Sequence, residues 1–106
     1  MKRLKYNNKK TNGYDSKEES KYAAQLKLLL KKGDITDLQE QVKFQLIPPQ
    51  YIDGKCIEKR CSYIADFVYN ENGKIVVVDV KGVRTPEYVI KRKLMLYIHK
   101  IKIKEV

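Results

Sequence analysis

The sequence has little of several residue types on which particular protein classes depend. Its 106 residues include no tryptophan, one histidine and two cysteines. Two cysteines cannot build a disulfide framework, and Cys56 and Cys61 with the distant His99 make a poor zinc site. We interpret both cysteines as ordinary residues of a hairpin.

Long apolar segments are also missing. No apolar run approaches the ~20 residues that a membrane-spanning helix needs, and the first ten residues lack the apolar core of a signal peptide. We therefore expect a soluble, cytoplasmic protein. At this length the chain has room for one domain.

Acidic residues are few compared with basic ones: 13 against 23, which gives a formal charge of +10. Such an excess in a short chain favours a polyanionic partner. Residues 1–14 contain five basic residues, no acid and no hydrophobic period. We expect a flexible basic arm over residues 1–14, followed by a folded domain over residues 15–106.

Hydrophobic spacing predicts two helices. The first covers about residues 17–32, with Gly33 as its C-cap. Its apolar positions are Tyr22, Ala23, Leu26, Leu29 and Leu30. The second begins at Thr85 and Pro86, which suit the N-cap and first helical positions. Its expected apolar face consists of Val89, Ile90, Leu94 and Tyr97.

Four further segments are expected to be strands. They cover residues 41–47, 61–69, 74–81 and 100–106, and Pro48-Pro49 ends the first of them. Between the first two, Asp53-Gly54 indicates a loop or short hairpin over residues 51–60. The last segment alternates isoleucine and lysine, which suits a protected edge strand. The predicted order is therefore αβββαβ, an α/β fold.

Two aspartates stand in strand-forming segments where hydrophobic residues are expected. If Asn72 and Gly73 form a two-residue turn, paired positions have numbers that add to 145. Asp66 and Asp79 then face each other with β-carbons ~4.5 to 5.5 Å apart. Lys81 lies two residues on, on the same face. A one-residue bulge would break this relationship.

This arrangement suggests phosphodiester chemistry. Two carboxylates ~5 Å apart repel by ~3 kcal/mol at an effective dielectric near 20. A Mg²⁺ or Mn²⁺ ion relieves that repulsion, because both ions prefer hard oxygen ligands. Lys81 can orient a water or neutralise charge on a phosphate. The alternative is a solvent-exposed face on which Lys81 only balances charge.

A third acid can join this pair from the first helix. Ser16 and Glu19 have the spacing of a capping box, which alone accounts for Glu19. Glu19 also shares a helix face with Ala23 and Leu26, so its carboxylate can point toward the aspartates. Glu18 is the alternative acid on this helix.

With these residues assembled, the chain resembles the PD-(D/E)XK nuclease superfamily, which includes restriction endonucleases and archaeal Holliday junction resolvases. The resemblance covers about residues 14–106. The chain is also similar to small phage-encoded proteins of unassigned function and to the endonuclease subunit of certain cut-and-paste transposons. The segments that carry the resemblance are SKEESKYAAQLKLLLKKGDI, QVKF, YIADFVYNENGK and VVVDVKG.

The resemblance implies a restriction-endonuclease-like αβββαβ core, a mixed central sheet flanked by helices, and a role for each site residue. Asp66, Asp79 and the Val80 carbonyl would hold the metal with support from Glu19, and Lys81 would position the water. Gln41 would match a glutamine often found on the first strand. The sequence departs from the common motif at two positions, Ala65 in place of proline and Asp79 in place of glutamate.

From these observations we expect a Mg²⁺- or Mn²⁺-dependent DNA endonuclease that acts on Holliday junctions or other branched DNA as a homodimer. Two alternatives remain: a non-catalytic DNA- or RNA-binding protein, and a nuclease active only within a larger phage recombination, replication or packaging complex. The residues expected to contact phosphates are Lys9, Lys10, Arg84, Lys91, Arg92 and Lys93.

Overall fold

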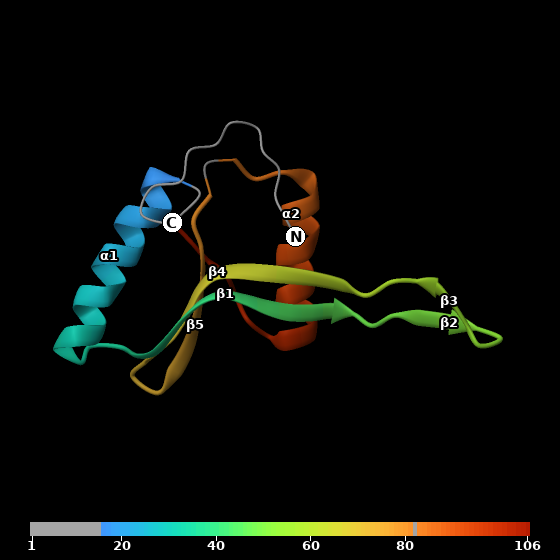
Figure 1. Ribbon diagram of the computed structural model, residues 1–106, viewed down its shortest axis with the longest axis horizontal. Coiled ribbons are helices and arrows are strands. Elements are labelled where there is room, and N and C mark those ends of the chain that lie inside the picture. Colours follow the sequence, from blue (N-terminus) through green and yellow to red (C-terminus); the bar gives the residue numbers. More distant parts are fainter. Residues whose placement is uncertain (1–15, 82) are drawn as a thin grey trace.

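The computed structural model describes residues 16–81 and 83–106 (Figure 1). The basic arm predicted for residues 1–14, including Lys9 and Lys10, lies outside these residues. The elements are α1 (Lys17–Lys32), β1 (Thr36–Ile47), β2 (Gln50–Ile52), β3 (Lys55–Glu58), β4 (Cys61–Glu71), β5 (Lys74–Asp79), α2 (Pro86–Leu94), the π-helix η1 (Met95–His99) and β6 (Lys104–Glu105). None of these helices is long and apolar enough to span a membrane.

Four strands form a mixed sheet in the order β1-β4-β5-β6. β4 pairs antiparallel with β1 and β5, whereas β6 is parallel to β5. A parallel neighbour requires a crossover connection, and α2 with η1 supplies it. The helices and the four-stranded sheet therefore follow the predicted order. β2 and β3 pair separately and project from the body as a two-stranded ribbon (Figure 1).

The predicted turns are confirmed by backbone conformation. Asn72 and Gly73 both have positive φ, 53° and 78°, as a type I′ hairpin turn requires. The β4–β5 pairs run from Glu71↔Lys74 to Phe67↔Val78, in the register predicted from this turn. Asp53 and Gly54 make the corresponding turn between β2 and β3, also with positive φ.

Helix α1 has the predicted bounds and caps. The Ser16 hydroxyl accepts a hydrogen bond from the Glu19 N–H at 3.0 Å, and Gly33 ends the helix with a φ of 86°. The left-handed Gly33 closes the last turn, as expected of a helix C-cap. Of the predicted apolar positions, Leu29 packs against the core, whereas Leu30 is exposed.

The apolar face predicted for the second helix is correct only in part: Leu94 packs against the core, but Ile90 and Tyr97 do not. Tyr88 and Met95 are buried, whereas Ile90 and Tyr97 are 59% and 75% exposed. The Tyr88 ring packs near the Tyr63 ring, with centroids 6.3 Å apart, and this contact sets which side of the helix faces the sheet. The last turn also widens into the π-helix η1, which shifts the side-chain positions after Leu94.

The segment after Lys100 is shorter as a strand than predicted. Only Lys104 and Glu105 pair with β5, although Ile103 is buried and the lysines beside it are exposed, as the alternation predicts. Among the cysteines, Cys56 is exposed on β3 and Cys61 begins β4, and both thiols are free.

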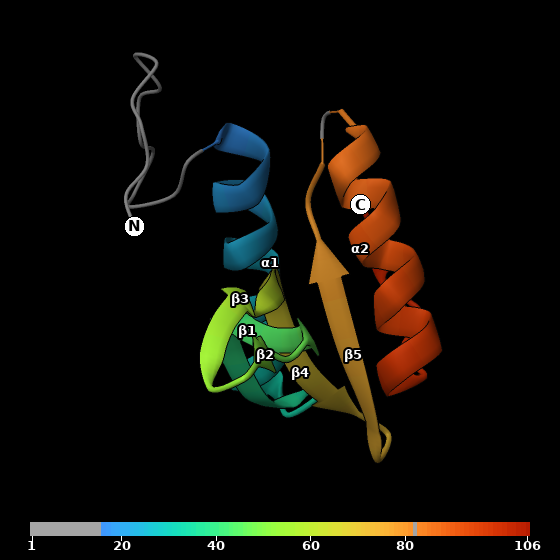
Figure 2. The same ribbon diagram turned by 90° about the vertical axis from the view of Figure 1, so that its right-hand side faces the viewer.

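The core consists of two clusters, one under each helix. α1 packs on Phe67, Tyr69 and Val78, while α2 and η1 pack on a cluster that includes Ala65, Val68 and Val77. Figure 2 shows the two helices on opposite sides of β5. Ala65 and Val68 share a cluster although they are three residues apart, so the alternation of β4 breaks between them.

Candidate active site

The site predicted from the sequence lies at one edge of the molecule. The N-terminal ends of α1 and α2 and the carboxyl end of β5 meet there, as Figure 2 shows. This arrangement places Glu19 in the first turn of α1, Asp79 at the last residue of β5, and Lys81 two residues beyond it. The break in alternation on β4 places Asp66 beside them.

Asp79 is the most deeply buried acid of the site, at 1% exposure. Its Oδ2 accepts a hydrogen bond from the Tyr63 hydroxyl at 2.5 Å. Its Oδ1 is buried, accepts no hydrogen bond from the described residues, and lies 3.5 Å from Lys81 Nζ. Asp79 therefore has one oxygen fixed by a neutral donor and the other facing a cation.

Asp66 has different partners. Its Oδ2 accepts a hydrogen bond from the Val80 N–H at 2.8 Å, and its Oδ1 accepts one from Gln41 Nε2 at 3.4 Å. Gln41 Nε2 also lies 3.3 Å from Glu19 Oε2, so the amide bridges the two carboxylates. Glu19 is 8% exposed and is the α1 acid at this site, whereas Glu18 is exposed to solvent.

Burial raises the pKa of the Asp66 carboxyl above its ordinary value, and the charge of Asp79 raises it further. The Val80 N–H, Gln41 and Lys81 oppose this effect because they stabilise the carboxylate. The two aspartates are thus close enough to repel each other, as the register predicts. The two aspartates have different hydrogen-bond partners. The β4–β5 ladder ends at the pair Phe67↔Val78, and beyond it the Val80 N–H donates to the Asp66 side chain.

Lys81 is held on one side of the site by an aromatic ring. Its Nζ lies 4.8 Å from the centroid of the Tyr88 ring and 3.5 Å from Asp79 Oδ1. A cation over a ring face is attracted by the ring quadrupole. Burial and the hydrogen bond to Asp79 raise the pKa of the Tyr63 hydroxyl, so this tyrosine remains a proton donor.

Tyr63 and Tyr88 were not predicted as site residues. Their spacing from Asp66 and Thr85 matches no known site motif. In the sequence, both tyrosines stand at positions that suit ordinary aromatic residues of the core. Only the β4–β5 pairing and the packing of α2 bring their side chains to Asp79 and Lys81. No pattern in the sequence therefore predicts the contact of Tyr63 with Asp79 or of Tyr88 with Lys81.

The arginines expected to bind phosphates have an internal partner, Glu105 on β6. Arg84 Nε lies 2.8 Å from Glu105 Oε1, and Arg92 Nη1 lies 2.9 Å from Oε2. The Tyr88 hydroxyl donates to the same carboxylate at 2.7 Å. The hydrogen bonds from Tyr88 and Arg92 contribute most to lowering the pKa of Glu105 to about 2. Arg92 therefore links α2 to β6, and Arg84 links the segment before α2 to the same strand.

The two helix lysines expected to contact phosphates, Lys91 and Lys93, are held less firmly than the two arginines. Lys91 Nζ lies 3.4 Å from Glu87 Oε2 one helical turn away, and Lys93 is exposed. An ion pair of this kind on a helix surface is weak, so Lys91 can exchange Glu87 for another anion.

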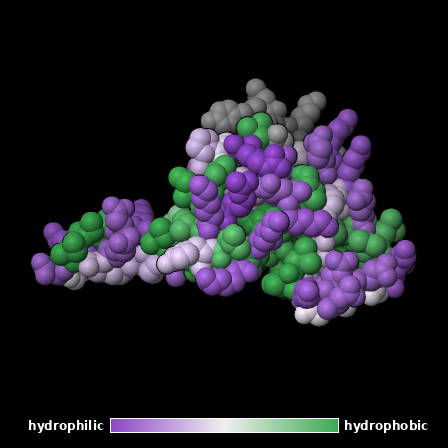
Figure 3. Space-filling model, turned by 180° about the vertical axis from the view of Figure 1, so that it is seen from behind, coloured by the Kyte–Doolittle hydropathy of each residue, from purple (hydrophilic) through white to green (hydrophobic). Residues whose placement is uncertain are grey.

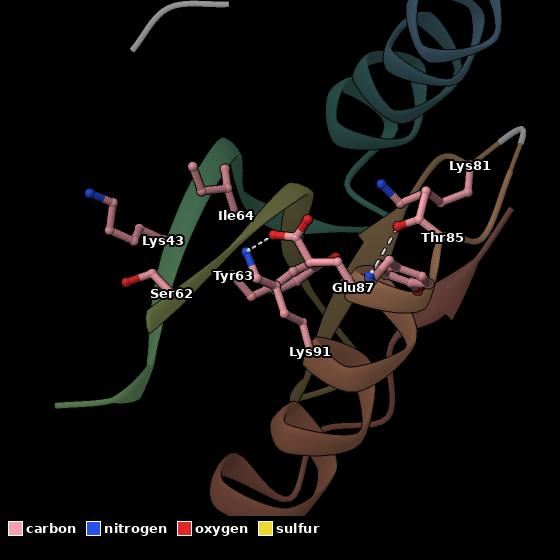
Figure 4. A pocket seen from close by; sticks show the side chains of 9 residues that line it. Lys43, Ser62, Tyr63, Ile64, Lys81, Thr85, Glu87 and Lys91 are labelled. Carbon is pink, nitrogen blue, oxygen red and sulfur yellow. Dashed lines mark hydrogen bonds and ion pairs between the residues drawn. The ribbon is translucent and has the colours of Figure 1, made fainter. Parts of the chain in front are cut away.

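A groove of about 470 Å³ opens beside Lys81 (Figure 4). Lys43, Ser62 and Ile64 line it from β1 and β4, and Thr85, Glu87 and Lys91 line it from the start of α2. Tyr63 and Tyr88 complete the lining. Three lysines, at positions 43, 81 and 91, thus line the groove, and among the described residues that line it Glu87 is the one acid.

The donor chemistry of the site fits a hard divalent cation. Within residues 16–81 and 83–106, no three His, Cys, Asp or Glu side chains converge closely enough to hold a metal unaided. Mg²⁺, however, is commonly held by one or two carboxylates together with waters and substrate phosphates. The buried Asp79 Oδ1, which accepts no hydrogen bond from the described residues, has the chemistry of such a ligand, and the Asp66 carboxylate and the Val80 carbonyl offer oxygens of the same kind.

Comparison with known proteins identifies one family. No curated protein matches the sequence, and no solved structure matches it either. Residues 3–105, nearly the whole chain, match the family described as "Protein of unknown function (DUF1064)". The chain therefore belongs to the DUF1064 family.

Proposed function

We propose that this protein is a divalent-metal-dependent DNA endonuclease that hydrolyses phosphodiester bonds. The observation that carries the proposal is the buried Asp79 carboxylate, whose Oδ1 lies 3.5 Å from Lys81 Nζ. A second aspartate, Asp66, lies beside it, and burial together with the charge of Asp79 raises the pKa of Asp66. An acid pair kept beside a lysine at a sheet edge is costly in a small domain and suits phosphate chemistry.

Each residue of the site has a distinct task under this proposal. Asp79, Asp66 and the Val80 carbonyl would hold a Mg²⁺ or Mn²⁺ ion, which when bound polarises a phosphate oxygen and acidifies a water. Tyr63 fixes the orientation of Asp79. Gln41 joins Asp66 to Glu19, and the Val80 N–H holds the other oxygen of Asp66.

Lys81 acts directly on the phosphate in this proposal. Its ammonium group faces both Asp79 and the groove, so it can neutralise charge that develops on the scissile phosphate or orient the attacking water. The Tyr88 ring keeps the ammonium from swinging away into solvent. The mixed sheet with a helix on each side is compatible with the restriction-endonuclease-like core implied by the resemblance to PD-(D/E)XK nucleases.

Branched DNA is the proposed substrate, and a homodimer is the proposed active form. Both follow from the resemblance to Holliday junction resolvases. Two symmetric active sites would let one dimer cut two strands of a junction.

One observation favours a second candidate, a non-catalytic nucleic-acid-binding protein of the same fold. The Lys81 ammonium lies 3.5 Å from Asp79 and neutralises its charge, so the fold tolerates Asp66 and Asp79 side by side without a metal. In that case Asp79 and Lys81 would stabilise the fold, and the basic groove alone would carry the function.

Cleavage of labelled DNA tests the proposal. Four-way junction, flap and linear duplex substrates are incubated with Mg²⁺, Mn²⁺ or EDTA. Wild type is compared with Asp79→Asn and Lys81→Ala, and with Asp34→Asn and Lys32→Ala, which alter an exposed ion pair at 3.8 Å.

Metal-dependent cutting that only the site variants abolish supports the nuclease, and preference for the junction supports the substrate. Binding of all three substrates without cutting in either metal overturns catalysis by the isolated chain. The second candidate, or a nuclease that needs other subunits of a phage complex, then takes its place.

A further inference from the structure

The β2–β3 ribbon is the part of the molecule that the fold uses least. Every residue from Tyr51 to Arg60 is exposed, and three large apolar side chains are among them: Tyr51 (62%), Ile52 (64%) and Ile57 (54%). Figure 3 shows apolar surface on this projection. A two-stranded hairpin alone is marginally stable in water, and apolar side chains that remain exposed on it add nothing to the stability of the core. Their exposure indicates a binding surface.

The ribbon and the groove beside Lys81 are continuous along the same two strands. β1 carries Lys43 toward the ribbon, and β4 leaves the ribbon and reaches Ser62 at its second residue. A molecule bound along the groove therefore passes from Lys81 to the base of the ribbon. Figure 1 shows the ribbon leaving the body on the side of α2.

The charges along this path suit a polyanion. Lys43, Lys81 and Lys91 line the groove, and Lys59 and Arg60 lie exposed where the ribbon joins β4. The acid in the groove lining, Glu87, is already paired with Lys91. Phosphates spaced along a nucleic-acid backbone match such a row of cations.

We propose that the groove and the β2–β3 ribbon form one binding surface for duplex DNA that flanks the cut site. Lys43 and Lys91 contact phosphates, and the ribbon lies in a groove of the duplex with Ile52 and Ile57 against the bases. The major groove of B-DNA admits a two-stranded ribbon, and apolar side chains in that groove contact the thymine methyl group. That the ligand is DNA rests on the proposed function.

The groove is tested by binding in EDTA, so that cutting plays no part. Fluorescence anisotropy with a labelled linear duplex compares Lys43→Ala/Lys91→Ala with Lys21→Ala/Lys31→Ala, which removes the same charge from exposed positions of α1. We expect the groove variant to bind about tenfold more weakly, with a salt slope smaller by about one for each lost contact. Equal weakening in the two variants overturns the role of the groove.

The ribbon is tested in two ways. Ile52→Ser/Ile57→Ser is expected to weaken duplex binding, whereas Leu28→Ser/Leu30→Ser, which replaces exposed leucines of α1, is not. A photo-crosslinker on Lys55→Cys, in a Cys56→Ser/Cys61→Ser background, is expected to join the protein to the duplex, because Lys55 pairs with Ile52 and shares the ribbon face of Ile52 and Ile57.

A crosslink to a second copy of the chain, or none at all, overturns the proposal and in the first case identifies the ribbon as a protein interface. Duplex binding that depends on groove and ribbon without any cleavage would leave this inference standing and remove only the nuclease. If the ribbon variant still cleaves DNA and binds duplex with unchanged affinity, the nuclease stands and the role of the ribbon in binding is overturned.

Discussion

Tyr63 on β4 donates a hydrogen bond to Asp79 on β5, joining two buried side chains that lie sixteen residues apart in the sequence. The hydroxyl takes one oxygen of Asp79 and leaves the other toward Lys81. In this way a residue without a catalytic group decides which oxygen of Asp79 is available.

Tyr63→Phe removes only that hydroxyl. A buried carboxylate oxygen that loses its donor costs ~1–3 kcal/mol of unfolding free energy. Because the aspartate can then rotate, cleavage should also fall by about 10- to 100-fold, as for other residues that orient metal ligands. Urea unfolding and the junction cleavage assay measure the two effects. Tyr97→Phe, at an exposed position, is the control and should change neither.

Asp66→Asn should make the protein more stable at neutral pH while abolishing cleavage. The folded-state pKa of Asp66 lies above the ordinary value of 3.8, so the folded state binds the proton more tightly than the unfolded state. The free energy of unfolding therefore falls as pH rises from near 3.8 through the raised pKa, and the cost is fully present above it. Asparagine removes this titration and can still accept the Val80 hydrogen bond.

Thermal unfolding of Asp66→Asn and wild type across this pH range measures the difference. The gain should appear as pH rises and should be absent below the ordinary pKa. A variant less stable than wild type at neutral pH would contradict the assigned cost. Asp34→Asn, at an exposed site, serves as the comparison.

Glu105→Gln should lower stability and raise DNA affinity together. It weakens three contacts, to Arg84, Arg92 and Tyr88, for which we expect a loss of ~1–2 kcal/mol. Since the pKa of Glu105 is lowered to about 2 from 4.5, its contribution is complete above 4.5 and is lost as pH falls through 2. The difference from wild type should therefore vanish at the acid end.

The affinity change has a separate cause and a separate measurement. Arg84 and Arg92 without their carboxylate partner become available to phosphates, so anisotropy in EDTA should show tighter duplex binding. Glu71→Gln removes one negative charge from an exposed position at the β4–β5 turn and controls for net charge. Equal gains in the two variants would mean that charge alone is responsible.

Gly73→Ala should cost about 1 kcal/mol of unfolding free energy, through backbone strain alone. Gly73 has a φ of 78°, and an added Cβ would meet no atom within 4 Å, so steric contact contributes nothing. Urea denaturation measures the loss. Asn72→Gly, which relaxes the neighbouring left-handed residue at φ 53°, should not reproduce it.

Much of the fold was predictable because its signals are local. Ser16 and Gly33 set the ends of α1, and Asn72-Gly73 fixed the β4–β5 register as far as Phe67↔Val78. That register is why Asp66 and Asp79 were expected together. Their different partners could not be predicted, because the break in alternation on β4 depends on two helices packing at different points along one strand.

Contacts across the crossover were also beyond local signals. Glu105 reaches Arg84 and Arg92 only because β6 returns parallel to β5, and no spacing in the sequence links these three residues. Ile90 on α2 and Tyr97 on η1 were wrongly expected to be buried with Leu94, because the three residues have helical spacing. Tyr88 faces inward because Tyr63 and Glu105 together offer its ring and its hydroxyl better contacts.

Gln41 has a φ of 55° in the middle of β1, at the level where β4 passes from one core cluster to the other. Its amide is also the link between Glu19 and Asp66. The left-handed position in β1 and the contact that assembles the acids thus belong to one residue. The conformation of one strand residue therefore decides whether the α1 acid and the β4 acid are held together.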